Sequence, residues 1–192
     1  MRIVGGKHRG RRLLAPPGTT VRPTSDRTRE ALFNILSHGR FAASGIPFVG
    51  AAVLDAFAGT GAFGLEALSR GAAEAVFIEQ DRAVLEILRH NVEALGEGTR
   101  ARILYGDAVH PPSAVFPCAV AFLDPPYQSG LAAPALAALR EAGWLAPASL
   151  AVVEIAAREE LPPSPGFTVV DERVYGASRL VLLRATDESV PS

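Results

Sequence analysis

The sequence predicts an α/β fold around a mostly parallel, seven-stranded sheet that ends in a C-terminal antiparallel hairpin. Three observations predict this fold. Short apolar runs alternate with helical segments from residue 51 onward, a glycine-rich turn follows the first run, and the last two runs have no helix between them. Strands covered by helices on both faces are apolar along their whole length, so continuous runs indicate a parallel sheet.

The strands and helices of the sheet follow one another in a regular order. Five apolar runs predict the parallel strands, at residues 51–55, 75–79, 102–105, 119–123 and 150–154. Helices are expected between them, at residues 62–69, 81–95 and 130–142. The closing hairpin is expected from residues 167–174 and 180–183, which are joined by a turn at 175–178.

Residues 1–40 are expected to form a basic arm and a helix, distinct from a main domain over residues 41–192. A cap at residues 23–26 predicts a helix that ends before Gly39. Residues 1–40 contain nine Lys and Arg but only two acidic side chains, a net charge of +7, whereas the remainder carries −8.

This charge asymmetry indicates a polyanionic partner, although the whole chain has a net charge of only −1. Neutralisation of phosphates is the main sequence-independent contribution to nucleic-acid binding, and arginine both pairs with phosphate and stacks on bases. We therefore expect nucleic acid to contact Lys7, Arg9, Arg11, Arg12, Arg22 and Arg27.

Composition argues against several other classes of protein. The single cysteine, Cys118, cannot form an internal disulfide or a multi-cysteine zinc site. The four histidines have no metal-ligand spacing, so no metal is expected. No apolar stretch approaches the roughly 18 residues of a membrane-spanning helix. We therefore expect a soluble cytoplasmic protein with no membrane partner.

A glycine-rich loop follows the first predicted strand. Gly59, Gly61 and Gly64 satisfy G-x-G-x-x-G, and Glu79 ends the next strand, where Rossmann-like folds place a ribose-binding acid. The loop therefore predicts a cofactor that contains a nucleoside. Asp55, at the entrance to the loop, would repel a pyrophosphate but would favour the sulfonium and ammonium groups of S-adenosylmethionine.

Acidic residues end other predicted strands too, and ligands of such sheets bind beyond the carboxyl ends of the strands. Asp107 ends the third strand, where its carboxylate could accept a hydrogen bond from an adenine amino group, and Asp124 ends the fourth. The candidate cofactor-binding residues in this part of the chain are Asp55, Phe57, Gly59, Gly61, Glu79, Gln80, Asp107 and Ala108.

The tetrapeptide Asp124-Pro125-Pro126-Tyr127 directly follows the fourth predicted strand. Consecutive prolines make a rigid turn, which holds the Asp124 carboxylate and the Pro125 carbonyl as two acceptors. Two acceptors on the N–H groups of an exocyclic base amine favour a pyramidal nitrogen and direct its lone pair at a methyl donor. Tyr127 offers a face on which the base could stack. We therefore expect these four residues to be catalytic.

Residues 55–61 and the tetrapeptide at 124–127 resemble the amino-methyltransferase superfamily, whose members methylate base amines or a glutamine amide. Residues 4–13, 22–36 and 175–180 are similar to the bacterial 16S ribosomal RNA guanine-N2 methyltransferase D family. The resemblance extends from residue 3 to about residue 184.

This resemblance implies a class I, Rossmann-like, S-adenosylmethionine-dependent methyltransferase with its catalytic domain at residues 41–192. Its substrate would be the N2 amine of a guanine in small-subunit ribosomal RNA, on an assembled or assembling particle, and the enzyme would be a monomer. Residues 1–40 would form a lid over RNA and cofactor, with Arg22, Thr24 and Arg27 near the entrance and Thr24 among the cofactor-binding residues.

Three other interpretations remain open at this point. The tetrapeptide also fits an adenine-N6 methyltransferase acting on DNA or RNA, although the basic arm and the short chain favour the first interpretation. An RNA-binding module with an inactive cofactor fold is a second possibility, which the intact tetrapeptide disfavours. A Rossmann dehydrogenase is a third, because the glycine loop alone also fits a dinucleotide.

Overall fold

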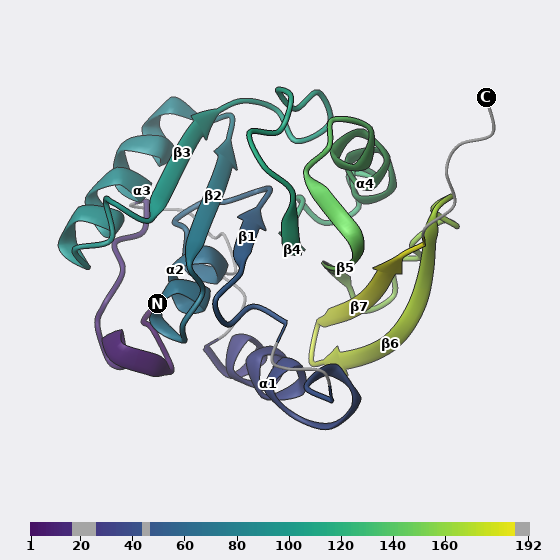
Figure 1. Cartoon of the computed structure of the whole chain (residues 1–192), viewed down its shortest axis with the longest axis horizontal. Coiled ribbons are helices and arrows are strands. Elements are labelled where there is room, and N and C mark those ends of the chain that lie inside the picture. The colour runs from purple at the N-terminus through teal and green to yellow at the C-terminus, as the bar shows by residue number, and fades with distance from the viewer. Residues whose placement is uncertain (17–25, 44–46, 187–192) are drawn as a thin grey trace.

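The computed structural model describes residues 1–16, 26–43 and 47–186. Within these ranges a single seven-stranded sheet runs through the molecule in the order β3-β2-β1-β4-β5-β7-β6 (Figure 1). Its strands are β1 (Ala52–Asp55), β2 (Glu74–Glu79), β3 (Ala101–Tyr105), β4 (Cys118–Leu123), β5 (Leu145–Ala156), β6 (Phe167–Tyr175) and β7 (Ser178–Ala185).

The pairing of these strands confirms the predicted mostly parallel sheet. Strands β1 to β5 pair in parallel, whereas β7 pairs antiparallel with both β5 and β6. The predicted C-terminal hairpin is therefore β6–β7, inserted so that its second strand lies beside β5. Strands β2 and β3 are added on one side of β1, and β4 and β5 on the other side. The strand order therefore reverses between β1 and β4, which is where such sheets bind ligands.

Strand β5 is much longer than predicted, and β7 extends past the predicted residues 180–183 at both ends. The apolar run at 150–154 predicted only the second half of β5, which begins at Leu145. The first half contains Pro147 and Ala148, the latter at φ 56, and the pairing with β4 shifts register between Cys118 and Val120. Proline and a positive φ are typical of turns, so a strand that passes through an irregularity has no clear sequence pattern.

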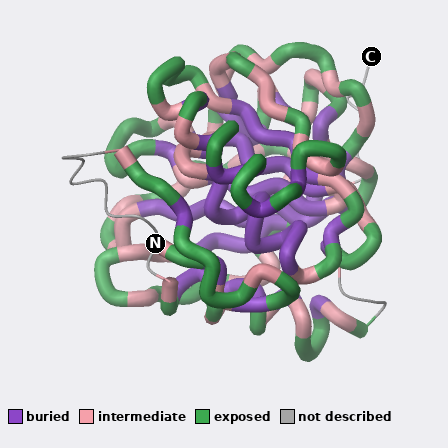
Figure 2. The backbone as a smooth tube through the Cα atoms, turned by 90° about the vertical axis from the view of Figure 1, so that its left-hand side faces the viewer, coloured by how far each residue is buried: buried purple, intermediate pink, exposed green. Residues whose placement is uncertain are grey.

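The helices cover both faces of the sheet. They are α1 (Asp26–Ser37), α2 (Ala62–Ser69), α3 (Arg82–Ala94) and α4 (Ala132–Glu141), with short 3₁₀ turns η1 (Gly6–His8) and η2 (Gly39–Phe41). Alternate residues of β1 enter different apolar clusters: Val53 packs with α1, α2 and α3 side chains, and Leu54 with those of α4. Figure 2 shows the buried residues gathered in the middle of the molecule.

The described part of the N-terminal arm packs against the body of the protein. The Ile3 N–H donates to the Arg11 carbonyl (2.9 Å) and the Gly10 N–H to the Ile3 carbonyl (2.9 Å), which folds residues 1–12 back on themselves. Ile3 is fully buried and belongs to the apolar cluster under α1, α2 and α3. The division of the chain at residue 40 into arm and catalytic domain stays a prediction.

A buried charge cluster joins the arm, α1 and α2. Arg29 is fully buried and its guanidinium donates to Asp26 Oδ1 (2.9 Å), while its Nε lies 3.6 Å from Glu66 Oε2. The same Glu66 oxygen accepts from the Val4 N–H (2.8 Å). If one of these segments moved away, a buried charge would be left without its partner, which is strongly destabilising. The cluster therefore holds the arm, α1 and α2 in one arrangement.

Candidate functional site

A cavity of about 820 Å³ opens at the carboxyl ends of β1, β2 and β4. Its described lining comes from the glycine loop, the β2–α3 turn, the end of β3 and the segment after β4. The N-terminal arm adds Met1, Ala15 and Pro16. Segments that are distant in sequence meet here because parallel strands end at the same edge of a sheet.

Most of the predicted site residues with described positions line this cavity. The four tetrapeptide residues do so, together with Phe57, Gly59, Glu79, Gln80 and Ala108. Asp55, Gly61 and Asp107 are not among its lining residues. Arg22 and Thr24 lie outside the described residues.

Asp55 is placed differently from our expectation. Its side chain is only 1% exposed and its Oδ2 accepts from the Gly64 N–H (2.9 Å) in the first turn of α2. The residue that caps α2, Gly61, has no side chain, so the carboxylate arriving from β1 satisfies the helix amide instead. Burial raises the pKa of Asp55 to about 7, against lowering by its hydrogen bonds to the α2 backbone. Asp55 therefore stabilises the glycine loop from the protein interior, through its bond to the start of α2.

The position of Asp55 bears on the choice of cofactor. In dinucleotide-binding folds the free amides at the start of this helix hold a pyrophosphate. Here those amides bond to a carboxylate of the protein itself. The described cavity lining also contains Glu79, Asp81 and Asp124 but no Lys, Arg or His. This residue set fits a cationic adenosyl compound such as S-adenosylmethionine and disfavours a pyrophosphate.

Glu79 joins the glycine loop to the start of α3. Its Oε2 accepts from the Gly59 N–H (2.8 Å) and its Oε1 from the Asp81 N–H (2.8 Å). Each carboxylate oxygen has a second lone pair, so Glu79 can hold these two backbone segments and still accept from hydroxyl groups of a ligand.

Two of the loop glycines are required where helix α2 packs closely on its neighbours. Gly61 has φ +83, and a Cβ there would lie 2.4 Å from Leu88 Cδ1. A Cβ on Gly64 would lie 2.3 Å from Phe77 Cε1. The absence of these side chains lets α2 pack closely on β2. Gly59, at φ +52, is the loop glycine of the motif that lines the cavity.

Asp107 is held by its own turn. Its Oδ1 accepts from the Val109 N–H (2.9 Å), and its Oδ2 lies 3.0 Å from His110 Nδ1. These hydrogen bonds hold the pKa of Asp107 below its ordinary value. The residues on either side, Gly106 and Ala108, line the cavity. The carboxylate is therefore ionised and fixed at the edge of the site, and its contact with an adenine stays a prediction.

The tetrapeptide is anchored by residues that sequence reasoning missed. The Tyr127 hydroxyl donates to Glu154 Oε1 (3.0 Å) at the end of β5 and lies 2.8 Å from Ser178 Oγ at the start of β7. Partial burial is the main cause that raises the pKa of Tyr127 to about 12. The only signal in the sequence was Glu154 itself, an acid ending an apolar run. These bonds fix the ring of Tyr127 while leaving the residue 37% exposed.

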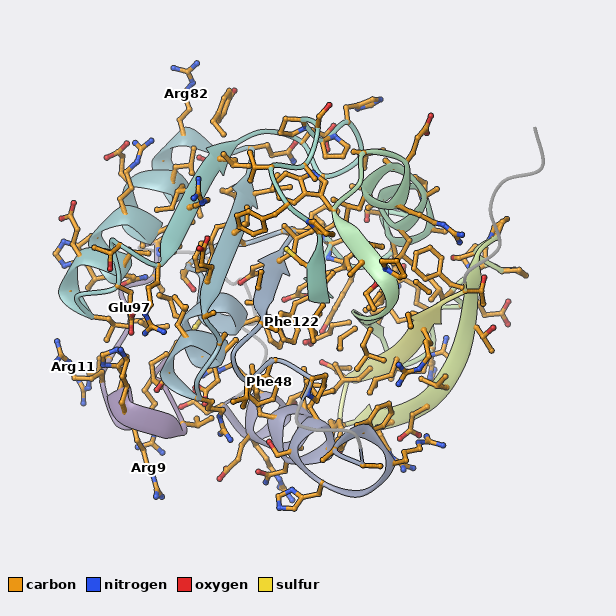
Figure 3. The ribbon with its side chains drawn as sticks, in the orientation of Figure 1. Arg9, Arg11, Phe48, Arg82, Glu97 and Phe122 are labelled. Atoms are coloured by element: carbon orange, nitrogen blue, oxygen red, sulfur yellow. The ribbon has the colours of Figure 1, made fainter. Side chains whose placement is uncertain are left out.

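The basic residues predicted to contact nucleic acid fall into two groups. Lys7 pairs with Glu97 (2.8 Å), which follows α3, and Arg11 donates to the Ala94 carbonyl (2.6 Å) at the end of α3, so both help to attach the arm to this part of the molecule. Arg9, Arg12 and Arg27 are exposed, and their side chains make no hydrogen bond or ion pair within the described ranges. Figure 3 shows Arg9 and Arg11 at the edge of the molecule beside η1.

Two further searches of the described residues bear on the expected partners. No helix there combines the length and apolar character that crossing a membrane requires. No group of three or more His, Cys, Asp or Glu side chains in residues 1–16, 26–43 and 47–186 is placed to hold a metal ion.

The chain is similar to known proteins over nearly its whole length. A family model described as conserved hypothetical protein 95 matches residues 1–184. Ribosomal RNA small subunit methyltransferase D of Escherichia coli (strain K12) is 41% identical over 193 residues, which cover 98% of this chain and 93% of that protein. The protein of the same name from Haemophilus influenzae is 34% identical over 181 residues, covering 92% and 89%.

A solved structure has the same fold. The structure of yhhF from Escherichia coli superposes with a TM-score of 0.83 at 39% sequence identity, covering 98% of this chain and 99% of that one. The two proteins therefore share their fold over nearly the whole of both chains.

The raised pKa of Asp55 predicts a pH-dependent stability. Between pH about 4 and 7 the unfolded state ionises Asp55 while the folded state keeps it protonated, so stability falls as pH rises through this window. Asp55→Asn removes this titration and keeps an acceptor for Gly64. We expect the free energy of unfolding of the variant to rise relative to the natural protein by at most about 4 kcal/mol across the window. Urea unfolding at a series of pH values measures this, and parallel profiles would contradict it.

Proposed function

Because this chain belongs to the ribosomal RNA small subunit methyltransferase D family, we propose that it methylates a base amine in small-subunit ribosomal RNA, using S-adenosylmethionine. We assign the acceptor as the N2 amine of a guanine. The observation that carries the proposal is that the tetrapeptide at 124–127 and the glycine loop line one cavity. A methyl donor on the loop and an amine at the tetrapeptide would therefore share one space.

The residues that would hold the cofactor are already partly oriented. Glu79 has acceptor capacity for the ribose hydroxyls, and Asp107 is ionised and could accept from the adenine amine. Phe57, Ile78 and Ala108 supply apolar surface around them. When bound, S-adenosylmethionine supplies a methyl group made electrophilic by its sulfonium.

The tetrapeptide supplies the acceptors for the amine. The Asp124 carboxylate and the Pro125 carbonyl follow the end of β4, and the two prolines restrict the backbone between them. Acceptors held in place before the reaction direct the nitrogen lone pair and stabilise the positive charge that develops on nitrogen. Pro125 is buried and Asp124 half-buried, so these groups lie at the floor of the cavity rather than in solvent.

Tyr127 would hold the base itself. Base–aromatic stacking contributes about 1–3 kcal/mol, and a base that reaches this site must be unpaired or flipped out. Because its hydroxyl is bonded on two sides, the ring would meet the base in one orientation. The exposed Arg9, Arg12 and Arg27 would contact the RNA backbone outside the cavity.

The rival interpretations differ from this one in testable ways. A dehydrogenase is disfavoured because the α2 amides bond to Asp55. The adenine-N6 alternative uses the same acceptors, so the choice of guanine rests on the family resemblance. We take the substrate to be the small subunit or its precursor, acted on in the cytoplasm by a monomer.

The deciding experiment is an assay of tritiated methyl transfer from S-adenosylmethionine. Substrates are small subunits from a strain that lacks the enzyme, naked ribosomal RNA and DNA, with nucleoside mass spectrometry of the product. We expect N2-methylguanosine at one position of the small-subunit RNA. Equal labelling of DNA, or N6-methyladenosine as the product, would overturn the proposal.

Asp124 is expected to act on the reaction and not on cofactor binding. Asp124→Ala removes one acceptor from the amine, so kcat should fall by at least about 100-fold. The Kd for S-adenosylhomocysteine, measured by calorimetry, should stay within about tenfold of the natural value. Asp124→Asn keeps one oxygen acceptor, so its kcat should lie between that of the natural protein and that of Asp124→Ala. Turnover at the natural rate by the alanine variant would remove Asp124 from the mechanism.

Arg9 and Arg12 are the arm residues best placed to contact phosphate, because each is exposed and has no partner in the described structure. The double variant Arg9→Gln, Arg12→Gln should bind small subunits more weakly and lower the slope of log Kd against log salt by about 2. Filter binding over a range of salt concentrations measures the slope. Arg89→Gln is the control, because Arg89 is exposed on α3 and, among the described residues, pairs with Glu86 alone. An unchanged slope in the double variant would exclude these phosphate contacts.

A further inference from the structure

Asn91 is a buried polar residue that the proposed chemistry does not use. It lies on α3 and is 1% exposed. Its amide nitrogen donates to the Leu14 carbonyl (3.1 Å) and to the Thr60 carbonyl (3.0 Å). Its oxygen accepts from the Leu14 N–H (2.8 Å). One side chain therefore bonds to the backbone of two segments far apart in the sequence.

Both segments reach the cofactor cavity. Thr60 belongs to the glycine loop and lines the cavity, as do Ala15 and Pro16, which directly follow Leu14. Met1, at the other end of the arm, also lines the cavity and lies 3.4 Å, through its sulfur, from the Thr60 hydroxyl. The arm is thus one wall of the cavity and the glycine loop the adjoining wall, with the Asn91 amide bonded to both.

The remainder of the arm is attached elsewhere. The Val4 N–H donates to Glu66 and the His8 N–H to Ser69, both on α2, while the His8 ring lies 2.6 Å from Glu97. These bonds hold residues 3–12 without involving the cavity. Among the described residues of the arm, Asn91 bonds to Leu14, so loss of its amide would weaken the attachment of this end and leave the bonds of residues 3–12 in place.

We propose that Asn91 is a positioning residue that couples occupancy of the cofactor cavity to the order of the N-terminal arm. A ligand in the cavity contacts both the arm and the glycine loop, and it therefore stabilises the arrangement in which both are in place. The hydrogen bonds of Asn91 stabilise the same arrangement. Coupling between two binding events is reciprocal, so an arm fixed by RNA raises the affinity for the cofactor by the same factor that the cofactor raises the affinity for RNA. This last consequence rests on the proposed function, whereas the link between arm and cavity does not involve RNA.

Trypsin offers a probe of this coupling, because Arg12 lies two residues before Leu14, whereas Lys7 lies in the part of the arm that is held elsewhere. The experiment measures the rate of cleavage after Arg12 by mass spectrometry, with and without S-adenosylhomocysteine, and cleavage after Lys7 is the internal reference that the ligand should not change. In the natural protein we expect the ligand to slow cleavage several-fold. In Asn91→Ala it should have no effect, the Kd for the ligand should rise about tenfold by calorimetry, and the KM for the cofactor should rise with kcat changed less than twofold.

Two further variants keep the test decisive. His90→Ala, an exposed neighbour on α3, should keep the protection seen in the natural protein. Leu14→Pro removes the N–H that donates to the Asn91 oxygen, one of the two bonds between these residues, and leaves α3 unchanged, so it decides the question if Asn91→Ala fails to fold by circular dichroism. The protection should be clearly weaker in Leu14→Pro than in the natural protein.

Protection that persists in both Asn91→Ala and Leu14→Pro, or is absent from the natural protein, would overturn the inference. A protein that binds the ligand and protects its arm but does not methylate ribosomal RNA would leave the inference standing and refute the proposed function. Failure of the natural protein to bind the ligand at all would overturn both.

Discussion

The structure depends most on the bond between the Asp55 carboxylate and the Gly64 amide. This bond joins the end of β1 to the first turn of α2, and the whole glycine loop lies between its two partners. A side chain at Gly61 would be strained by its φ of +83 and would displace Leu88, and one at Gly64 would clash with the Phe77 ring. A helix that begins without a capping side chain of its own needs an acceptor from elsewhere, and the central strand supplies it.

Asp55 and Glu79 together give the site its electrostatic character. Glu79 holds the loop from the opposite end through the Gly59 amide, and its charge contributes to the raised pKa of Asp55. With the α2 amides already bonded and only acidic side chains among the charged side chains of the described lining, these groups favour a cation over a phosphate. One buried carboxyl group therefore makes this loop less suited to a pyrophosphate than its glycine pattern alone suggests.

The N-terminal arm has two roles that its charge alone does not reveal. Lys7 and Arg11 attach it to the end of α3 and the residues that follow, and Ile3 adds to the apolar core, whereas Arg9 and Arg12 remain exposed. The segment is thus a packed part of the molecule with a basic outer surface. The sequence alone does not show which basic residues attach the arm and which stay exposed, because an arginine in an ion pair and one in solvent look the same in a sequence.

The sequence by itself determined the parallel strands, the helices between them, the closing hairpin and the tetrapeptide at the end of β4, since these follow from local periodicity and turn chemistry. Only the tertiary structure decided that Asp55 faces α2, that Glu154 and Ser178 hold Tyr127, and that Asn91 bonds to both Leu14 and Thr60. Each of these bonds joins elements separated along the chain, so its geometry depends on how helices and strands pack and not on any local pattern.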